Sequence, residues 1–279
     1  RARYGRNAFE RIPMARSNPY QAIEHGAPGR IGWRIHYFEE LDSTQTTARE
    51  LANEGSAQGT VVIAERQTAG RGRMGRTWHS PAGANLYATF ILRPAMPIAE
   101  VPRLSLVAGV AAAEALAREA PGLVALKWPN DVWLRGRKVG GIIAEAMTDL
   151  HGALEAVLLG IGLNLNLAPE DIPAELRDKA TSLRAVLGRP CDRIAIAESL
   201  CSFLDYRYME VVAQGFGAVR PVWEGFSALT GKRVTVVDGE RREAGIVRGI
   251  DPDGALILDT GAELRRILAG DVSIEGAYE

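Results

Sequence analysis

A loop rich in glycine and arginine, enclosed by two apolar segments, limits the possible folds of this sequence more than any other feature. Apolar residues at 60–65 and 85–92 predict a buried strand on either side of the loop, which covers residues 67–84 and is called here the glycine–arginine loop. It contains the run Gln67-Thr68-Ala69-Gly70-Arg71-Gly72-Arg73-Met74-Gly75-Arg76-Thr77-Trp78. Its glycines match the spacing of a dinucleotide-binding turn and, less closely, of a phosphate-binding P-loop, but both of those must open a helix. Pro81, Gly83 and a strand follow instead, which disfavours both motifs.

The glycine–arginine loop is also strongly cationic. Arg66, Arg71, Arg73 and Arg76 lie in or beside it, and no acidic residue occurs over positions 66–99. Guanidinium groups bind carboxylates and phosphates through paired hydrogen bonds, and glycine lets a ligand approach the backbone closely. The pattern therefore indicates a site for a carboxylate or a polyphosphate. A solvated basic loop is the structural alternative, and nucleic acid is a weaker one because few aromatic residues could stack on bases.

A second group of polar residues lies in the middle of the chain. The run Lys127-Trp128-Pro129-Asn130-Asp131 follows a predicted strand, and its lysine, asparagine and aspartate could bind a nucleotide and a divalent cation. An ordinary β-turn is the alternative. The next predicted strand contains Lys138 just before Gly140 and Gly141, which would hold an ammonium group beside bare backbone. A later strand contains Gly160-Ile161-Gly162-Leu163-Asn164.

Periodicity divides the chain into three parts. Residues 1–30 show no period and are expected to form an extended arm, whereas residues 31–230 mix strands and helices and predict an α+β domain with a mixed sheet. Residues 231–279 contain short strands separated by Asp-Gly and Thr-Gly turns, which predicts a small β-barrel. The expected strands are at 31–37, 60–65, 85–92, 123–128, 132–134, 139–146, 154–165, 232–237, 242–249, 255–259 and 263–268; helices are expected after Ser43, at 104–119 and over most of 180–229.

Composition excludes several classes of protein. The 33 Lys and Arg residues nearly balance the 34 Asp and Glu residues, so no global field attracts nucleic acid or an anionic membrane. No apolar run reaches the roughly 18 residues of a membrane span. Cys191 and Cys201 cannot supply a disulfide framework, and no His/Cys cluster has zinc spacing. We therefore expect free buried thiols and a cytoplasmic protein without a nucleic-acid or membrane partner.

Taken together, the motifs resemble those of the biotin protein ligases. The resemblance runs in order from about residue 37 to about residue 275. It implies a class-II-synthetase-like catalytic domain over residues 31–230, followed by an SH3-like β-barrel over residues 231–279. The matching segments are Asp42-Ser43-Thr44, Gln67 to Arg76, Ser80 to Tyr87, Lys127 to Asp131, Lys138 to Ile142 and Gly160 to Asn164.

The resemblance also implies a reaction in two steps. Biotin carboxylate attacks the α-phosphate of MgATP and gives biotinoyl-5′-AMP and pyrophosphate. A lysine of a biotin carboxyl carrier protein domain then takes the biotinoyl group and releases AMP. ATP and biotin would be substrates, and Mg²⁺ would assist.

Site residues follow from the same resemblance. Lys138, Arg73 and Asp131 would be catalytic, with Lys138 contacting both the biotin carboxylate and the α-phosphate and Asp131 binding Mg²⁺. The biotin site would contain Ser43, Thr44, Gln45, Gln67, Arg71, Gly72, Arg73, Lys138, Gly140 and Gly141. The ATP and adenylate site would contain Arg71, Arg73, Arg76, Trp78, Asn130, Asp131, Lys138 and Asn164.

The sequence departs from the family pattern in two places. Gln45 stands where the family commonly has asparagine. Residues 1–30 are too short for the winged helix-turn-helix of bifunctional members, so the chain resembles the monofunctional type, and a homodimer is expected from the family. The alternatives are a lipoate or octanoyl ligase, which shares the architecture, and a non-catalytic nucleic-acid-binding protein that uses the terminal barrel.

Overall fold

The computed structural model describes residues 17–24 and 27–275 of the chain. Most of the arm predicted over residues 1–30 therefore lies outside the described residues. The short 3₁₀ turn Gln21–Ile23 lies beside the first strand, where Asn18 donates to Ile35 O at 3.1 Å and Glu24 accepts from Ile35 N at 2.9 Å.

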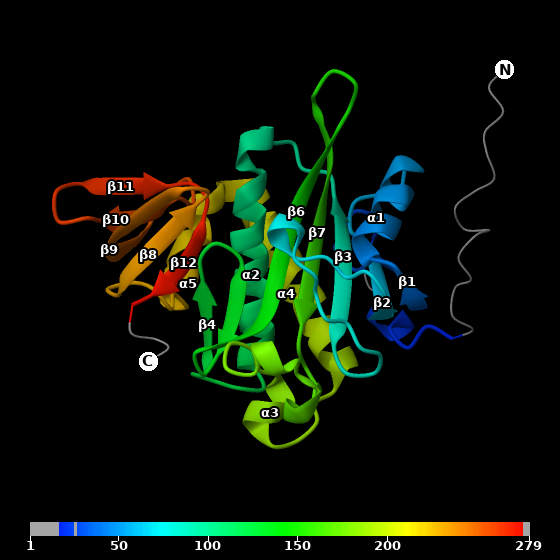
Figure 1. Ribbon diagram of the computed structural model, residues 1–279. Helices are drawn as coiled ribbons and strands as arrows, with labels where there is room; N and C mark the ends of the chain where they lie inside the picture. Colours follow the sequence, from blue (N-terminus) through cyan, green and yellow to red (C-terminus); the bar gives the residue numbers. More distant parts are fainter. Residues whose placement is uncertain (1–16, 25–26, 276–279) are drawn as a thin grey trace.

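A seven-stranded mixed sheet forms the centre of the molecule (Figure 1). The first two strands run parallel, and all other neighbours are antiparallel, so the predicted mixed sheet is confirmed. In spatial order the strands are β1 (Arg34–Leu41), β2 (Thr60–Gln67), β3 (Leu86–Leu92), β7 (Leu154–Leu163), β6 (Arg137–Thr148), β5 (Asp131–Leu134) and β4 (Val124–Lys127).

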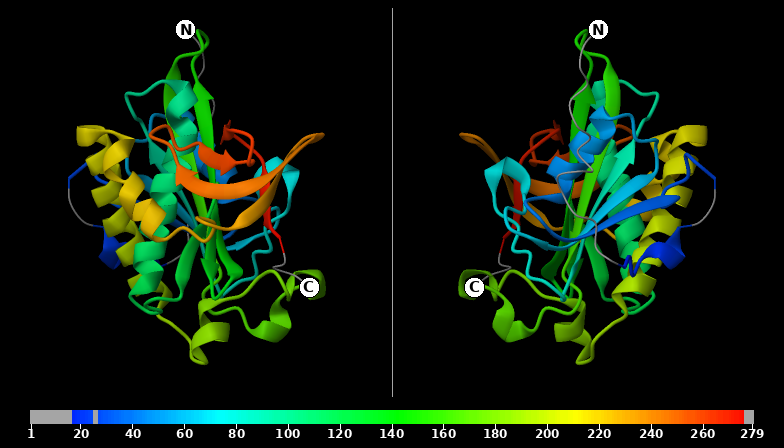
Figure 2. Two further views of the ribbon diagram at one scale, coloured as in Figure 1. Left: turned by 90° about the vertical axis from the view of Figure 1, so that its left-hand side faces the viewer. Right: turned by 90° about the vertical axis from the view of Figure 1, so that its right-hand side faces the viewer.

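Helices cover both faces of this sheet because successive strand residues point to opposite sides. Val62, Ile91 and Leu158 contribute to the core beneath α1 (Thr44–Asn53). Their neighbours Val61, Phe90 and Leu159 belong to the larger core. That core also holds α2 (Val101–Ala117) and α4 (Arg193–Gln214), which lie side by side in Figures 1 and 2.

The helical region predicted over 180–229 is broken into three helices. They are α3 (Leu183–Leu187), α4 and α5 (Arg220–Gly225). Gly188 ends α3 with a left-handed φ of 71°, and Gly215 follows α4 with a φ of 77°. Glycine adopts such backbone angles without strain, so these two residues stop helices that apolar spacing alone would continue. Cys191 and Cys201 are free and buried, as predicted.

The C-terminal part is a five-stranded antiparallel sheet, so the predicted α+β fold with a terminal all-β unit is confirmed. Its order is β11 (Leu264–Ile267), β10 (Leu256–Asp259), β9 (Arg241–Ile250), β8 (Arg233–Asp238) and β12 (Asp271–Ile274). β12 is not among the predicted strands; it has only four residues and pairs with β8 rather than with its neighbour in the chain. Such a short run carries too little periodicity to identify it as a strand.

Two of the contacts between the C-terminal sheet and the rest of the molecule lie at the turn between β9 and β10. The buried indole of Trp128 donates to Gly254 O at 2.9 Å, and Arg103 on α2 forms an ion pair with Asp253 at 2.7 Å. Gly254 has a φ of +82°, and a Cβ there would lie 2.8 Å from Leu106 Cδ1, so this turn requires glycine. The C-terminal sheet is thereby fixed against the turn that carries Asn130 and Asp131.

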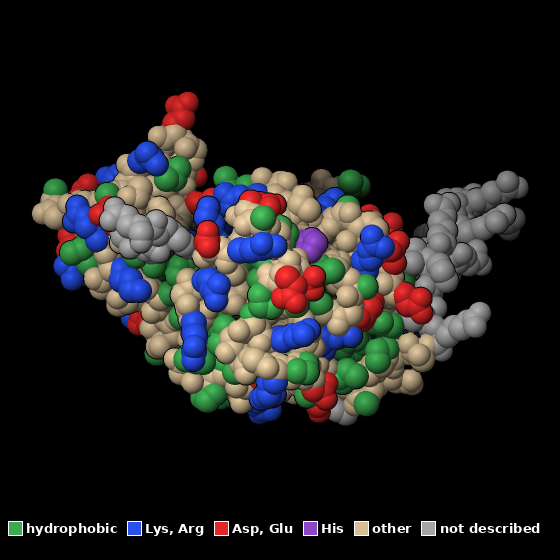
Figure 3. Space-filling view, turned by 60° about the horizontal axis from the view of Figure 1, so that its bottom comes forward, with side chains coloured by type: hydrophobic (Ala, Val, Ile, Leu, Met, Phe, Trp, Pro, Cys, Tyr) green, Lys and Arg blue, Asp and Glu red, His purple; other side chains and the backbone are tan. Residues whose placement is uncertain are grey.

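The charge distribution on the surface agrees with the near balance of basic and acidic residues in the sequence. The face drawn in Figure 3 carries basic and acidic side chains interspersed with one another. In the part of the chain that the structure describes, no helix has the length and apolar character needed to cross a bilayer.

Candidate active site

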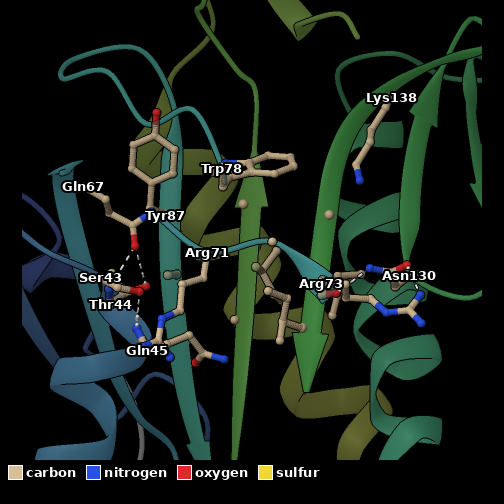
Figure 4. A pocket seen from close by; sticks show the side chains of 18 residues that line it. Ser43, Thr44, Gln45, Gln67, Arg71, Arg73, Trp78, Tyr87, Asn130 and Lys138 are labelled. Atoms are coloured by element: carbon tan, nitrogen blue, oxygen red, sulfur yellow. Dashed lines mark hydrogen bonds between the residues drawn. The ribbon is translucent and has the colours of Figure 1, made fainter. Parts of the chain in front are cut away.

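The first of two adjoining cavities lies between the glycine–arginine loop and the central sheet (Figure 4). Its space, including the open mouth, is about 470 Å³. Nine of the ten residues predicted for the biotin site line it: Ser43, Thr44, Gln45, Gln67, Arg71, Gly72, Arg73, Lys138 and Gly141. The tenth, Gly140, is not in this wall; a Cβ there would lie 2.6 Å from Leu163 Cδ2, so it is needed for packing within the sheet.

Glycines on β6 and β7 form the floor of this cavity. A Cβ on Gly162 would lie 2.7 Å from the indole of Trp78, and one on Gly141 would lie 3.1 Å from the same ring. A Cβ on Gly160 would lie 3.2 Å from the amide of Gln45. These glycines therefore let the indole and the amide lie directly against the sheet backbone.

The start of α1 supplies a network of polar groups to the cavity. Ser43 is the N-cap, and its Oγ accepts from Gln45 N at 3.3 Å. Gln67 Oε1 accepts from Thr44 N at 2.9 Å and from Thr44 Oγ1 at 3.2 Å, while Gln67 Nε2 donates to Ser80 Oγ at 3.0 Å. Figure 4 shows Ser43, Thr44, Gln45 and Gln67 on the same side of the cavity. The network holds several donors and acceptors in fixed positions.

Two buried polar atoms of residues that line this cavity have no partner among the described residues. They are Gln45 Oε1 and Trp78 Nε1. Gln45 is only 4% exposed, and its Nε2 lies 3.5 Å from Leu158 O. A buried acceptor without a hydrogen bond costs free energy. Gln45 Oε1 is therefore an unsatisfied acceptor of a residue that lines the cavity.

A second cavity of about 1340 Å³, including its open mouth, adjoins the first. Both cavities are lined by Gly72, Arg73, Trp78, Asn130 and Lys138, so these residues form the boundary between them. Seven of the eight residues predicted for the nucleotide side line the second cavity, and the exception, Arg71, lines only the first. An apolar wall comes from Leu167, Ile172, Pro173 and Leu176.

Lys138 lies at this boundary. Its Nζ is 2.6 Å from Asp131 Oδ1 and 5.4 Å from the centre of the Trp78 ring. Its backbone N donates to Lys179 O at 2.8 Å, and its O accepts from Thr181 N at 2.8 Å. The ammonium group is thus held between the two cavities by one carboxylate and one aromatic face.

The arginines of the glycine–arginine loop have different surroundings. Arg73 donates to Asn130 Oδ1 at 2.9 Å, whereas the side chain of Arg71 has no hydrogen bond or ion pair within the described residues. Arg66 and Arg76 pair with Glu40 and Asp271. The absence of acidic residues over positions 66–99 therefore does not leave these two arginines unpaired, because their partners are distant in the sequence.

Some residues that line the cavities are not among those assigned to the biotin and ATP sites. Lys127 lines the second cavity; burial lowers its pKa, and its Nζ lies 5.1 Å from the centre of the Trp133 ring. Asp271 comes from β12, and Tyr87 comes from β3. The motif at 127–131 predicts a nucleotide contact for Lys127, although Lys127 was not included in the ATP site, and no local pattern indicates the other two.

Asn164 has a mainly structural position. It is 7% exposed, its Nδ2 donates to Thr181 O at 3.1 Å, and its Oδ1 accepts from Asn85 at 3.4 Å. These bonds connect the end of β7 to Thr181 and to Asn85, which directly precedes β3.

Comparison with known proteins agrees with this architecture. Residues 37–164 match the Biotin/lipoate A/B protein ligase family, and residues 229–274 match the Biotin protein ligase C terminal domain. The "Bifunctional ligase/repressor BirA" of Bacillus subtilis is 36% identical over 244 residues, which cover 88% of this chain and 75% of that protein. The "Biotin--[acetyl-CoA-carboxylase] ligase" of Paracoccus denitrificans is 36% identical over 84% of this chain and 98% of that protein.

A solved structure with a similar fold is the biotin protein ligase from Aquifex aeolicus in complex with biotin and ATP. It has a TM-score of 0.76 and 30% identity, and the match covers 87% of this chain and 98% of that one. Fold and site thus define the class of the biotin and lipoate protein ligases. The match to the biotin protein ligases includes the C-terminal sheet, and the relatives quoted above cover most of the chain. The chain therefore belongs to the biotin protein ligase family.

Proposed function

We propose that this protein attaches biotin to a specific lysine of a biotin carboxyl carrier protein domain, using ATP. The observation that carries the proposal is the pair of adjoining cavities that meet at Arg73 and Lys138. The first has a polar wall suited to the ureido ring of biotin, and the second has an apolar wall suited to a nucleobase. Two anions that must react with each other would meet at the cationic boundary.

The proposed reaction takes place in two steps. A carboxylate oxygen of biotin forms a bond to the α-phosphorus of ATP while the bond to the β-phosphate oxygen breaks, and pyrophosphate leaves. The lysine amine of the carrier then attacks the biotinoyl carbonyl carbon, loses a proton and displaces AMP. Adenylation needs mainly positioning and charge stabilisation, which this site can supply.

We assign different cationic side chains to the two reacting anions. Arg71 has no partner within the described residues and lines only the first cavity, so we assign it to the biotin carboxylate. Lys138 stabilises the negative charge that develops at the α-phosphate. Asp131 is the only carboxylate paired with Lys138 in the described residues, and those residues contain no cluster of metal-binding side chains. This fits Mg²⁺ held mainly by phosphates, with Asp131 as its protein partner, and the ion would neutralise phosphate charge.

Residues 31–230 would act as the catalytic unit, with residues 231–279 as the C-terminal unit. The carrier domain or a second copy of the chain could use an open strand edge. β5 pairs with β6 only as far as Gly141, so residues 143–148 of β6 have no strand partner on that side within the described chain. Unpaired strand edges readily accept a strand from another molecule.

The decisive test measures exchange of labelled pyrophosphate into ATP. We expect exchange that depends on biotin and Mg²⁺ and is absent with lipoate. Equal exchange with lipoate or octanoate would establish the alternative acyl ligase. No exchange with any acid, together with binding of DNA or RNA at physiological salt, would favour the non-catalytic alternative.

Gln45 offers a separate test of the biotin cavity. Gln45→Met keeps the length of the side chain but removes the unpaired acceptor. We expect biotin affinity to fall about 2- to 12-fold, since a net hydrogen bond is worth about 0.5–1.5 kcal/mol. The unliganded variant should have a higher Tm than the parent, because the buried Oε1 has no partner in the described residues. Calorimetric titration and thermal unfolding measure the two effects.

Gln58→Met is the matched control. The Gln58 amide is fully engaged: it donates to Gly29 O and accepts from Arg93 N and Tyr208 Oη, and it lines neither cavity. This control should lower the Tm and leave biotin affinity unchanged. Unchanged biotin affinity in Gln45→Met would remove Gln45 from the site.

A further inference from the structure

The glycine–arginine loop contacts the C-terminal sheet through an ion pair between Arg76 and Asp271. The two residues are 195 positions apart in the sequence. Both side chains line the second cavity, and neither lines the first. The pair therefore lies at the nucleotide end of the site rather than at the biotin end.

Asp271 is held on a rigid support. It begins β12 and pairs with Val237 of β8. The preceding Gly270 has a φ of +135°, and a Cβ there would lie 2.9 Å from Val236 Cγ1 and from Val237 O, so the turn into β12 requires glycine. The C-terminal sheet is in turn fixed to the central sheet by the buried bond from Trp128 to Gly254.

The glycine–arginine loop has much less support around Arg76. Met74 has a left-handed φ of 54° and is 70% exposed, and positions 74–77 are all exposed. A loop with few buried contacts has low local stability, so single contacts shift its population of conformations. The Arg76–Asp271 pair thus joins a loosely supported cationic segment to a fixed carboxylate.

We propose that Asp271 is a positioning residue that docks the glycine–arginine loop over the nucleotide cavity. The C-terminal sheet would thereby assist ATP binding without touching the reacting atoms. Both side chains of the pair are largely exposed, and exposed pairs shift equilibria only about 1.5- to 5-fold. The docking therefore adjusts the fraction of closed loop and does not determine it alone. Only the part concerning ATP rests on the proposed function.

Limited trypsin digestion tests the docking without substrates. Trypsin cleaves after Arg71 and Arg73, and mass spectrometry separates these cuts from others. We expect Asp271→Asn to speed both cuts about 2- to 5-fold and Asp271→Glu to stay within about 1.5-fold of the parent. The control Asp259→Asn removes the Arg248–Asp259 pair of the same sheet, which lines neither cavity, and should leave cleavage unchanged.

Salt provides an independent readout of the same pair. Near 1 M NaCl the Debye length falls to about 3 Å, so the ion pair should be screened. The parent should then be cleaved as fast as Asp271→Asn. The cleavage rate of Asp271→Asn should not change with salt. Rates are normalised to a peptide substrate because salt also affects trypsin. Equal cleavage of the parent and Asp271→Asn at low salt would overturn the docking.

The link to ATP is tested by steady-state kinetics. We expect Asp271→Asn to raise the KM for ATP about 2- to 5-fold, with kcat and biotin affinity unchanged within about 1.5-fold. An unchanged KM for ATP with faster cleavage would overturn the role in nucleotide binding. Failure of the chain to form any adenylate would refute the proposed function. The digestion experiment would still test the docking, because it uses no substrates.

Discussion

Lys138→Ala should lose about 100- to 1000-fold in the rate of adenylate formation while keeping ATP affinity within about fivefold. Removing one group that stabilises charge in a transition state typically costs this much. The ammonium group lies at the boundary of the two cavities, where the carboxylate and the α-phosphate would meet. Its charge should count most as those anions approach, and less in the ground state.

Single-turnover formation of biotinoyl-5′-AMP and equilibrium binding of ATP separate the two effects. Arg137→Ala is the matched control, because Arg137 is the neighbouring cation on β6, is exposed and lines neither cavity. It should change neither quantity by more than about twofold. A Lys138→Ala variant with weakened ATP binding but a normal rate would show that Lys138 only binds.

The ion pair with Asp131 adds a consequence for the same lysine. Asp131 Oδ1 lies 2.6 Å from Nζ, so a substrate anion that binds Nζ must compete with this carboxylate. Asp131 would also hold Mg²⁺, and the ion would neutralise charge on the phosphates, so adenylation should depend on Mg²⁺.

The sequence predicted the parts of the fold that have strong local signals. The strands around the glycine–arginine loop and the turns of the C-terminal sheet are examples, because apolar runs and Asp-Gly turns are local properties. The prediction failed where a single residue ends a helix within a long apolar segment, and where a strand is very short. Gly188 and Gly215 break the helical region, and β12 is too short to show a period.

The candidate site was predictable mainly through its motifs. Nine of ten residues assigned to biotin line one cavity, since the motifs lie at the ends of strands that the sheet brings together. Gly140 was assigned with its neighbour because spacing cannot distinguish a cavity wall from sheet packing. Asp271 could not be predicted, because its contact with Arg76 depends on how the C-terminal sheet docks.

Arg73→Gly should still form biotinoyl-5′-AMP but release it about 10 to 150 times faster than the parent. Arg73 donates to Asn130 Oδ1 at 2.9 Å, and Asn130 is itself fixed, since it donates to Ile142 O at 2.8 Å and accepts from Ile142 N at 3.0 Å. Arg73 thus links the glycine–arginine loop to an immobile turn across the boundary of the cavities. A hydrogen bond from a charged group is worth about 1.5–3 kcal/mol, which gives the expected range of release rates.

Escape of the adenylate can be detected by the lysines that it acylates. The variant is incubated with biotin, MgATP and albumin, and albumin is then probed for biotin. Asn130→Ala should leak in the same way, because it removes the acceptor of the same bond. Arg66→Gly should not, since Arg66 pairs with Glu40 and lines neither cavity. Unlabelled albumin, with adenylate formation confirmed for Arg73→Gly, would mean that this arginine does not retain the intermediate and that closure of the loop depends on its other contacts.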